Sequence, residues 1–252
     1  GYQYVANHPP LYYAVMMPVY LLSRGASVEV QQYLLRLAAI PFGLLTVYAA
    51  FRTVRLLFPH DWFMLVTVPA FVAFQPQISY EAAMVNNDIA GIAFVSLVIY
   101  LLARGLRRGF DYVTCAWVGA ALGLAMLAKS NSLFIIPAIG IAIILGCGVR
   151  NWRQWIPKGV VTAAVGGMLV LPWYVWFYRT YGNLDAFEQI RTLQSPWNKP
   201  GGTFTELLFN RMFVWNRWKE TWGEFGWRRI HLDSGFLWAI AFPVIAGLGV
   251  LL

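Results

Sequence analysis

The chain has 252 residues, of which 59% are hydrophobic and 12% are charged, and its formal net charge at pH 7 is +8. A mean hydropathy of +0.57 with so few charged residues excludes a soluble globular domain of this length. The composition therefore predicts an all-α fold, in the form of a polytopic transmembrane helical bundle.

Apolar runs long enough to cross about 30 Å of hydrocarbon recur along the chain. The sequence predicts seven spans, at about residues 34–58, 62–79, 87–103, 112–128, 132–149, 159–178 and 236–252, the last being the truncated start of a further helix. Residues 9–22 are too short to cross and, with Pro9 and Pro10 in their first turn, predict an outer juxtamembrane helix. Cys115 and Cys147 both fall within spans, where an apolar setting keeps a thiol inert.

Basic residues gather in the loops on one face of the predicted bundle. They are Arg52, Arg55, Arg104, Arg107, Arg108, Arg150, Arg153 and Lys158. By the positive-inside rule this face is cytoplasmic, so residues 1–181 form the transmembrane region and about 182–235 form an extracytoplasmic loop. The sequence thus predicts a multi-pass protein of the plasma (inner) membrane whose active face is extracytoplasmic.

The unusual ionisable residues converge on the outer face. Asp88 opens a span directly after two asparagines, and it is either a helix N-cap or a rigidly held general base or metal ligand. Lys129 ends a span, and it either snorkels to the interface or binds a phosphate. His8 precedes two prolines that orient its imidazole, which makes it a candidate ligand or phosphate contact. Glu81 is interpreted as a solvated loop charge.

The loop at about 182–235 is rich in aromatic and basic residues. They include Trp197, Trp215, Trp218, Trp222, Trp227, Arg228 and Arg229. One interpretation is an aromatic belt with basic anchors at the level of the lipid headgroups. In the other, tryptophan faces stack on a sugar or acceptor while arginines contact an anionic phosphate. The two interpretations are compatible with each other.

Three motifs carry a family resemblance: Asn7-His8-Pro9-Pro10-Leu11-Tyr12-Tyr13, then Leu35-Arg36-Leu37 opening a span that ends at Arg52 to Phe58, then Val85-Asn86-Asn87-Asp88. Together they resemble the GT-C superfamily of membrane glycosyltransferases, in the branch of the protein mannosyltransferases and the lipid A aminoarabinose transferases. The resemblance implies an outer active site that takes a sugar from a polyprenyl-phosphate carrier, with a catalytic Asp in the first outer loop and another acidic residue in the second. Asp88 matches the second-loop position. The first-loop Asp would fall upstream of Gly1, so we expect a fragment that lacks the first span and is inactive alone.

Two further stretches bear on the resemblance. The aminoarabinose transferases carry an acidic and then a basic residue before the paired prolines, which contribute to metal and lipid-phosphate binding, whereas this chain has Asn7-His8. This departure weakens the inference of a metal site. The resemblance leaves a divalent cation open as a cofactor, and no residue pattern here requires one. The run from Thr221 to Trp227 is similar to the tryptophan-glycine motif of uncharacterised bacterial membrane proteins related to these transferases.

These observations predict sugar transfer from a polyprenyl-phosphate donor to a glycan, lipid or protein acceptor, with inversion at the anomeric carbon implied by the resemblance. Asp88 is the predicted catalytic base, and the predicted substrate-binding residues are Asn7, His8, Asn87, Lys129, Trp222, Arg228 and Arg229. The rival is a transporter or flippase of a lipid-linked or anionic substrate, in which the same residues line a pathway. A degenerate member that keeps the spans and has lost catalysis is a third alternative. Positive-inside topology explains the net charge better than a nucleic-acid partner does.

Overall fold

The computed structural model describes residues 8–182, 209–225 and 230–251, with side chains described as far as Val244. Its α-helices are α1 (Leu11–Ser23), α2 (Val28–Leu57), α3 (Trp62–Phe74), α4 (Pro76–Ala83), α5 (Asp88–Arg108), α6 (Tyr112–Ala128), α7 (Ile136–Cys147), α8 (Trp152–Tyr181), α11 (Arg211–Trp222) and α12 (Ser234–Leu251). A 3-10 helix, η1 (Ser130–Ile135), leads into α7, and an antiparallel hairpin of β1 (Glu224–Phe225) and β2 (Ile230–His231) follows α11. The all-α prediction is confirmed, with this small hairpin added.

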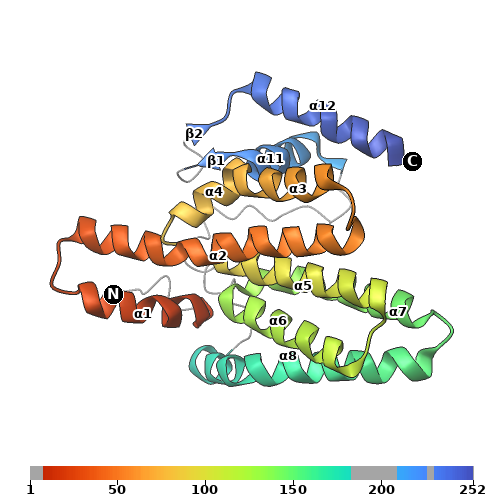
Figure 1. Cartoon of the computed structure of the whole chain (residues 1–252). Coiled ribbons are helices and arrows are strands. Elements are labelled where there is room, and N and C mark those ends of the chain that lie inside the picture. The colour runs from red at the N-terminus through yellow and green to blue at the C-terminus, as the bar shows by residue number, and fades with distance from the viewer. Residues whose placement is uncertain (1–7, 183–208, 226–229, 252) are drawn as a thin grey trace.

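The long helix α2 runs through the middle of the molecule. Figure 1 shows α3 and α4 on one side of α2, and α5, α6 and α8 on the other, with α1 alongside the amino-terminal half of α2. A buried apolar cluster joins α1, α2, α5 and α6, and consists of Tyr12, Met16, Ala39, Phe42, Ile89, Ala90, Ala93 and Ala128. Because alanine lets helix backbones approach closely, this cluster holds the start of α5 and the end of α6 near α1.

The contact between α6 and α8 depends on residues without bulky side chains. A Cβ atom added to Gly119 of α6 would collide with the backbone oxygen of Thr162 of α8, and one added to Gly166 would lie 3.0 Å from the backbone oxygen of Gly119. The buried hydroxyl of Thr162 donates a hydrogen bond to the Cys115 backbone oxygen at 3.2 Å. Close backbone packing of this kind is typical of helices that associate in a membrane, where small residues replace the hydrophobic effect as the basis of contact.

The prediction of seven spans is wrong. Four helical segments in the described part of the chain are long and apolar enough to cross a membrane, namely Val28–Leu57, Asp88–Arg108, Ser130–Cys147 and Trp152–Tyr181. A fifth exists if α3 and α4, which are bent by 56° at Gln75, are counted as one broken span. The helix Tyr112–Ala128 has 17 residues, a rise of about 25 Å against the roughly 30 Å of hydrocarbon. The described apolar part of α12, Ser234–Val244, is likewise a shorter helix.

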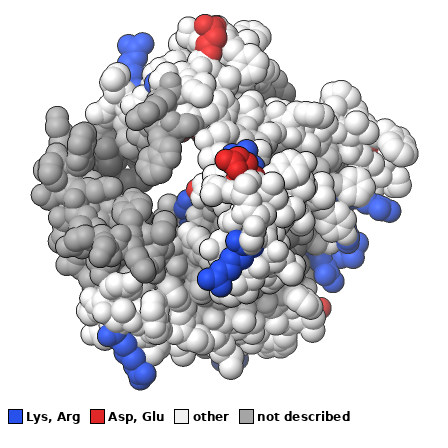
Figure 2. All heavy atoms as spheres, turned by 90° about the vertical axis from the view of Figure 1, so that its left-hand side faces the viewer, with Lys and Arg blue, Asp and Glu red and all other residues white. Residues whose placement is uncertain are grey.

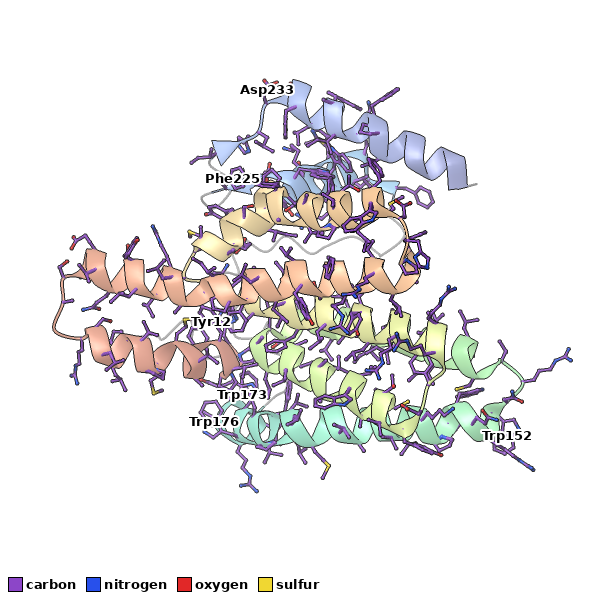
Figure 3. The ribbon with its side chains drawn as sticks, in the orientation of Figure 1. Tyr12, Trp152, Trp173, Trp176, Phe225 and Asp233 are labelled. Atoms are coloured by element: carbon purple, nitrogen blue, oxygen red, sulfur yellow. The ribbon has the colours of Figure 1, made fainter. Side chains whose placement is uncertain are left out.

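The tryptophans of α8 mark its two ends. Figure 3 shows Trp152 at one end of α8 and Trp173 and Trp176 at the other, on the side of the molecule where Tyr12 lies. The helix rise from Trp152 to Trp173 is about 30 Å, which matches the hydrocarbon thickness. Trp152 and Trp176 are both exposed. Exposed tryptophans at this spacing are typical of anchors at the two membrane interfaces, and they support α8 as a spanning helix.

The predicted separation of basic and site residues agrees with the helix directions. Arg52 and Arg55 lie near the end of α2, Arg107 and Arg108 end α5, and Arg153 lies in the first turn of α8. Figure 1 shows these three helix ends on one side of the bundle, while the start of α5 and the end of α6 lie toward the opposite side. We call the first of these the basic end. Which side of the membrane it faces stays a prediction from the positive-inside rule.

The helix predicted at residues 9–22 is present with a small difference in its start, and its place on the outer surface stays a prediction. The sequence predicts Pro9 and Pro10 inside the first turn, whereas α1 begins at Leu11 and Pro10 occupies the N-cap position. Both prolines therefore lie between His8 and the first residue of α1. The sequence of α1 contains Pro18 within the helix, and Tyr12 and Met16 are its buried apolar contacts with the rest of the bundle.

Candidate active site

A cavity of about 1030 Å³ lies away from the basic end, where α1, α4, the start of α5 and the end of α6 meet. Figure 2 shows this end of the molecule hollowed, with few charged side chains among the described atoms of the face. The lining residues are His8, Tyr12, Tyr13, Met16, Met17, Tyr20, Leu35, Gln77, Tyr80, Glu81, Met84, Val85, Asn86, Asn87, Asp88, Lys129, Glu220 and Glu224. The cavity therefore gathers most of the residues that the outer-face prediction singled out.

The start of α5 is fixed to the end of α6 by Asn87. This residue occupies the N-cap position of α5, but its side chain makes no capping hydrogen bond. Instead, the Asn87 Nδ2 group donates to the backbone oxygen of Ala128 at 3.1 Å, and the side chain is buried. Because Asp88 follows Asn87 and Lys129 follows Ala128, this one hydrogen bond places the two charged residues next to each other. Asn87 lines the cavity, yet its amide is used for this internal contact.

Asp88 and Lys129 form an ion pair at the cavity wall. The Lys129 ammonium group donates to Asp88 Oδ1, and the side chains of Lys129 and Asp88 are 26% and 32% exposed. The second carboxylate oxygen, Oδ2, accepts a hydrogen bond from Asn86 Nδ2 at 2.6 Å. The N-cap interpretation of Asp88 is wrong, because Asp88 is the first residue of α5 and its side chain points to Lys129 and Asn86. The ammonium group of Lys129 binds Asp88, and the position of Lys129 at the membrane interface stays a prediction.

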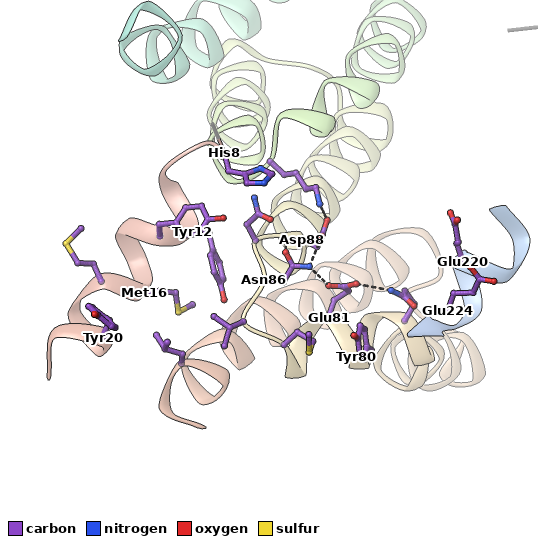
Figure 4. A pocket seen from close by; sticks show the side chains of 18 residues that line it. His8, Tyr12, Met16, Tyr20, Tyr80, Glu81, Asn86, Asp88, Glu220 and Glu224 are labelled. Atoms are coloured by element: carbon purple, nitrogen blue, oxygen red, sulfur yellow. Dashed lines mark hydrogen bonds and ion pairs between the residues drawn. The ribbon is translucent and has the colours of Figure 1, made fainter. Parts of the chain in front are cut away.

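Glu81 belongs to the same polar cluster, although the sequence suggests a solvated loop charge. It lies in α4 and is half-buried. Its Oε1 accepts from Gln77 Nε2 at 2.8 Å and its Oε2 accepts from Asn86 Nδ2 at 2.9 Å. Figure 4 shows Asn86 between the carboxylates of Glu81 and Asp88. The sequence signal that could have found this residue is the spacing of Gln77 and Glu81, which are four apart and so face the same side of a helix.

The electrostatic environment favours neutral His8 and lowers the proton affinity of Lys129. Burial lowers the pKa of His8 below its usual value, and the nearby positive charge of Lys129 lowers it further. Burial likewise lowers the pKa of Lys129, while the negative charge of Glu81 acts in the opposite direction. At neutral pH the imidazole of His8 is therefore uncharged and provides one N–H donor and one acceptor nitrogen.

The two walls of the cavity differ in chemistry. Tyr12, Met16 and Tyr20 of α1 line one side, and Figure 4 shows them facing the carboxylates of α4 and α5 across the cavity. Glu220 and Glu224 complete the far side, and Glu224 is held by Lys219 Nζ and His231 Nδ1, each 3.2 Å from its Oε1. These two glutamates were not among the predicted site residues. No sequence spacing connects them with Asp88, because they come from a distant part of the chain.

The other predicted substrate-binding residues lie elsewhere. Trp222, at the end of α11, is buried and packs edge-to-face on Phe71 of α3 with ring centroids 5.8 Å apart, and it does not line the cavity. Asn7, Arg228 and Arg229 lie outside the described residues. In the described segments, no group of three or more His, Cys, Asp and Glu side chains is placed to hold a metal ion.

Comparison with known proteins assigns the family. Residues 7–176 match the family model described as dolichyl-phosphate-mannose-protein mannosyltransferase, and this match covers more than half of the chain. No curated protein and no solved structure matches the chain. The matched range contains His8, Glu81, Asn87, Asp88 and Lys129, and it confirms the resemblance to membrane glycosyltransferases over the transporter alternative. The chain belongs to the dolichyl-phosphate-mannose-protein mannosyltransferase family, whose members are multi-pass membrane enzymes that use a lipid-phosphate-linked mannose donor.

Proposed function

We propose that this protein transfers mannose from a polyprenyl-phosphate donor to a hydroxyl group of a glycan, lipid or protein acceptor on the extracytoplasmic face of the plasma membrane. The observation that carries the proposal is the Asp88–Lys129 ion pair in the wall of a cavity of about 1030 Å³. The pair sets a carboxylate beside an ammonium group. Glycosyl transfer from a phosphate needs both, a base for the acceptor and a cation for the leaving group.

Asp88 is the proposed general base. The acceptor oxygen attacks C1 of the mannose and forms the new glycosidic bond, while the bond from C1 to the phosphate oxygen breaks. The polyprenyl phosphate leaves with the electron pair of that bond, and the carboxylate of Asp88 takes the proton of the acceptor hydroxyl. Attack from the face opposite the phosphate inverts the configuration at C1. A positioned general base of this kind contributes about 10²–10⁴-fold to the rate.

Lys129 is the proposed electrostatic partner of the departing phosphate. A lysine ammonium group carries three N–H donors, and Asp88 accepts one of them. The remaining donors are available to phosphate oxygens in the cavity, where partial exclusion of water strengthens the interaction. His8 lines the same cavity and, as a neutral imidazole, contributes an N–H donor to the phosphate.

The apolar wall of the cavity suits the isoprenoid part of the donor. Tyr12, Tyr13, Met16, Met17 and Tyr20 of α1 line it. Methionine and tyrosine side chains adapt to an irregular apolar chain and present polarisable surface to it. The volume of about 1030 Å³ lies just above the range of about 300–1,000 Å³ that is usual for ligand pockets, and so it has room for a mannosyl phosphate together with the first isoprene units.

The test measures transfer of radiolabelled mannose from polyprenyl phosphate mannose, in proteoliposomes, by the full-length protein that contains this chain. Asp88→Asn is compared with wild type and with Asp61→Asn. Asp61 caps α3, where its Oδ1 accepts from Met64 N at 3.1 Å, and asparagine caps helices equally well. We expect Asp88→Asn to lower transfer about 100-fold or more and Asp61→Asn to leave it unchanged. Transfer that survives Asp88→Asn, in protein with a wild-type elution profile, would show that Asp88 is not the base.

A further inference from the structure

A second cavity, of about 530 Å³, lies at the basic end, far from the Asp88–Lys129 pair. It is lined by Arg52, Arg55, Leu56, Pro59, Tyr100 and Arg108. Arg52 and Arg55 come from the last two turns of α2, Tyr100 and Arg108 come from the second half of α5, and Pro59 comes from the loop after α2. Guanidinium groups from two helices thus converge on one hollow, and none of the residues that line it carries a carboxylate.

Arg52 is already held in position. Its guanidinium group donates to the hydroxyl groups of Tyr48 and Tyr100, the second at 3.0 Å. It also lies over both rings, 5.5 Å and 5.3 Å from their centroids. An arginine fixed in this way loses little further side-chain freedom when it binds an anion. Its planar guanidinium group has five N–H donors, and those that do not bind the tyrosines can bind the anion.

The positive charge of the cavity is not neutralised by the described part of the chain. Arg52 donates to tyrosine hydroxyls, and Arg55 and Arg108 are exposed, with no ion pair to a described carboxylate. Guanidinium groups that surround one hollow repel each other, so an anion placed between them lowers the electrostatic energy. Groups with planar oxygen atoms fit best, because arginine binds carboxylate and phosphate through paired hydrogen bonds.

The helix dipole alone does not account for the arrangement. Basic side chains in the last turn of a helix stabilise its negative end, and Arg55, Arg107 and Arg108 all occupy such positions. That effect requires only a position in the last turn. It does not explain why Arg108 faces the same cavity as Arg52 and Arg55, while the neighbouring Arg107 does not line it.

We propose that the cavity at the basic end binds a phosphate group, supplied by the headgroup of an anionic phospholipid in the adjacent leaflet. Basic pockets between transmembrane helices on the cytoplasmic side bind anionic headgroups, and the tyrosine and leucine side chains of this cavity suit the glycerol and upper acyl carbons next to the phosphate. Free inorganic phosphate carries the same chemical group and is the alternative ligand for this cavity. The site is separate from the mannosyl-transfer site, and the proposal does not depend on the proposed reaction.

The experiment measures equilibrium binding of short-chain phosphatidylglycerol to the full chain in a neutral detergent, with inorganic phosphate alone as the second probe. Arg108→Gln is the test variant, because this exposed side chain makes no described ion pair and its loss leaves the helix packing intact. Arg107→Gln is the matched control, in the same helical turn and with the same change of charge. We expect phosphatidylglycerol to bind Arg108→Gln about tenfold more weakly than wild type, and Arg107→Gln to bind it as wild type does.

A second variant and the phosphate arm complete the test. Arg52→Gln should weaken phosphatidylglycerol binding by about the same factor as Arg108→Gln, with an unchanged elution profile as the control for folding. If inorganic phosphate binds with the same dependence on Arg108 and phosphatidylglycerol does not bind, the site stands and its ligand is free phosphate. Equal losses in Arg107→Gln and Arg108→Gln would reduce the effect to surface charge and overturn the proposal, as would the failure of both probes to bind wild type.

Discussion

The ammonium group of Lys129 and the carboxylate of Asp88 are 41 positions apart in the chain and form an ion pair where α6 ends and α5 begins. Each side chain is less than one third exposed, so removal of either charge leaves its partner partly desolvated without compensation. The pair therefore joins two helix ends and at the same time holds a carboxylate, the proposed base, beside an ammonium group. The predictions below separate these roles.

The first prediction concerns the charge of Lys129. Substitution of Lys129 by Gln should lower the turnover number for mannose transfer about 100-fold, because the departing phosphate loses its cationic partner in the cavity. Lys129→Arg keeps the charge and should retain more of the activity. Lys158→Gln removes a lysine at the basic end, near Cys147, and should behave as wild type. The measurement is initial rate against donor concentration, and a change confined to the Michaelis constant would contradict a role in the transition state.

The second prediction concerns the structural role of Asn87. Asn87→Ala removes the hydrogen bond to the Ala128 backbone oxygen and leaves that buried acceptor without its partner. The loss should lower the free energy of unfolding by about 1–3 kcal/mol and should reduce transfer by displacing Asp88 from Lys129. Asn131→Ala, at an exposed position just beyond Lys129, serves as the control. Unfolding is followed by intrinsic fluorescence in detergent, and equal stability of the two variants would refute the role of Asn87.

The third prediction compares two glycines at the contact between α6 and α8. Gly119→Ala introduces a Cβ that collides with the backbone oxygen of Thr162, and it should destabilise the protein by about 1–3 kcal/mol. Gly167, in α8, is exposed and has nothing within 4 Å of an added Cβ. Gly167→Ala should therefore stabilise the helix by about 0.5–1 kcal/mol. Thermal unfolding midpoints in one detergent check the pair, and shifts of the same sign would argue against close packing at Gly119.

The fourth prediction concerns the pH dependence of stability. The pKa of His8 in the folded protein lies below its usual value of 6.5, because burial and the nearby charge of Lys129 disfavour the protonated form. The unfolded chain therefore binds the proton more readily, so stability decreases as the pH falls through the unfolded value and stops decreasing below the folded value. His8→Gln should lose less stability than wild type between about pH 7 and about pH 5. Unfolding curves at both pH values measure the difference, and parallel losses in the two proteins would rule out His8 as a source.

Sequence patterns determined the features of this protein that depend on local composition. The apolar runs predicted the α-helices, and the loop arginines predicted the basic end. The three motifs at residues 7–13, 35–58 and 85–88 indicated the family, and the last of them supplied the candidate base. Each of these signals is contained in one short segment, so the sequence is sufficient to find it. Composition overestimated the number of spans. Hydropathy does not register the bend at Gln75, and the prediction counted residues 112–128 as a span although 17 residues are too few to cross about 30 Å of hydrocarbon.

The tertiary structure decided which polar side chains contact one another in the cavity wall. Glu81 belongs to the cluster because the chain bends by 56° at Gln75 and α4 places the Glu81 carboxylate 2.9 Å from Asn86 Nδ2. Trp222 does not line the cavity, because α11 packs this side chain against Phe71 of α3. Ion pairs and aromatic contacts between distant segments depend on how helices cross, and helix crossing follows from side-chain packing that hydropathy patterns do not encode. The sequence therefore identified Asp88 and Lys129 separately, and only the fold joined them into one site.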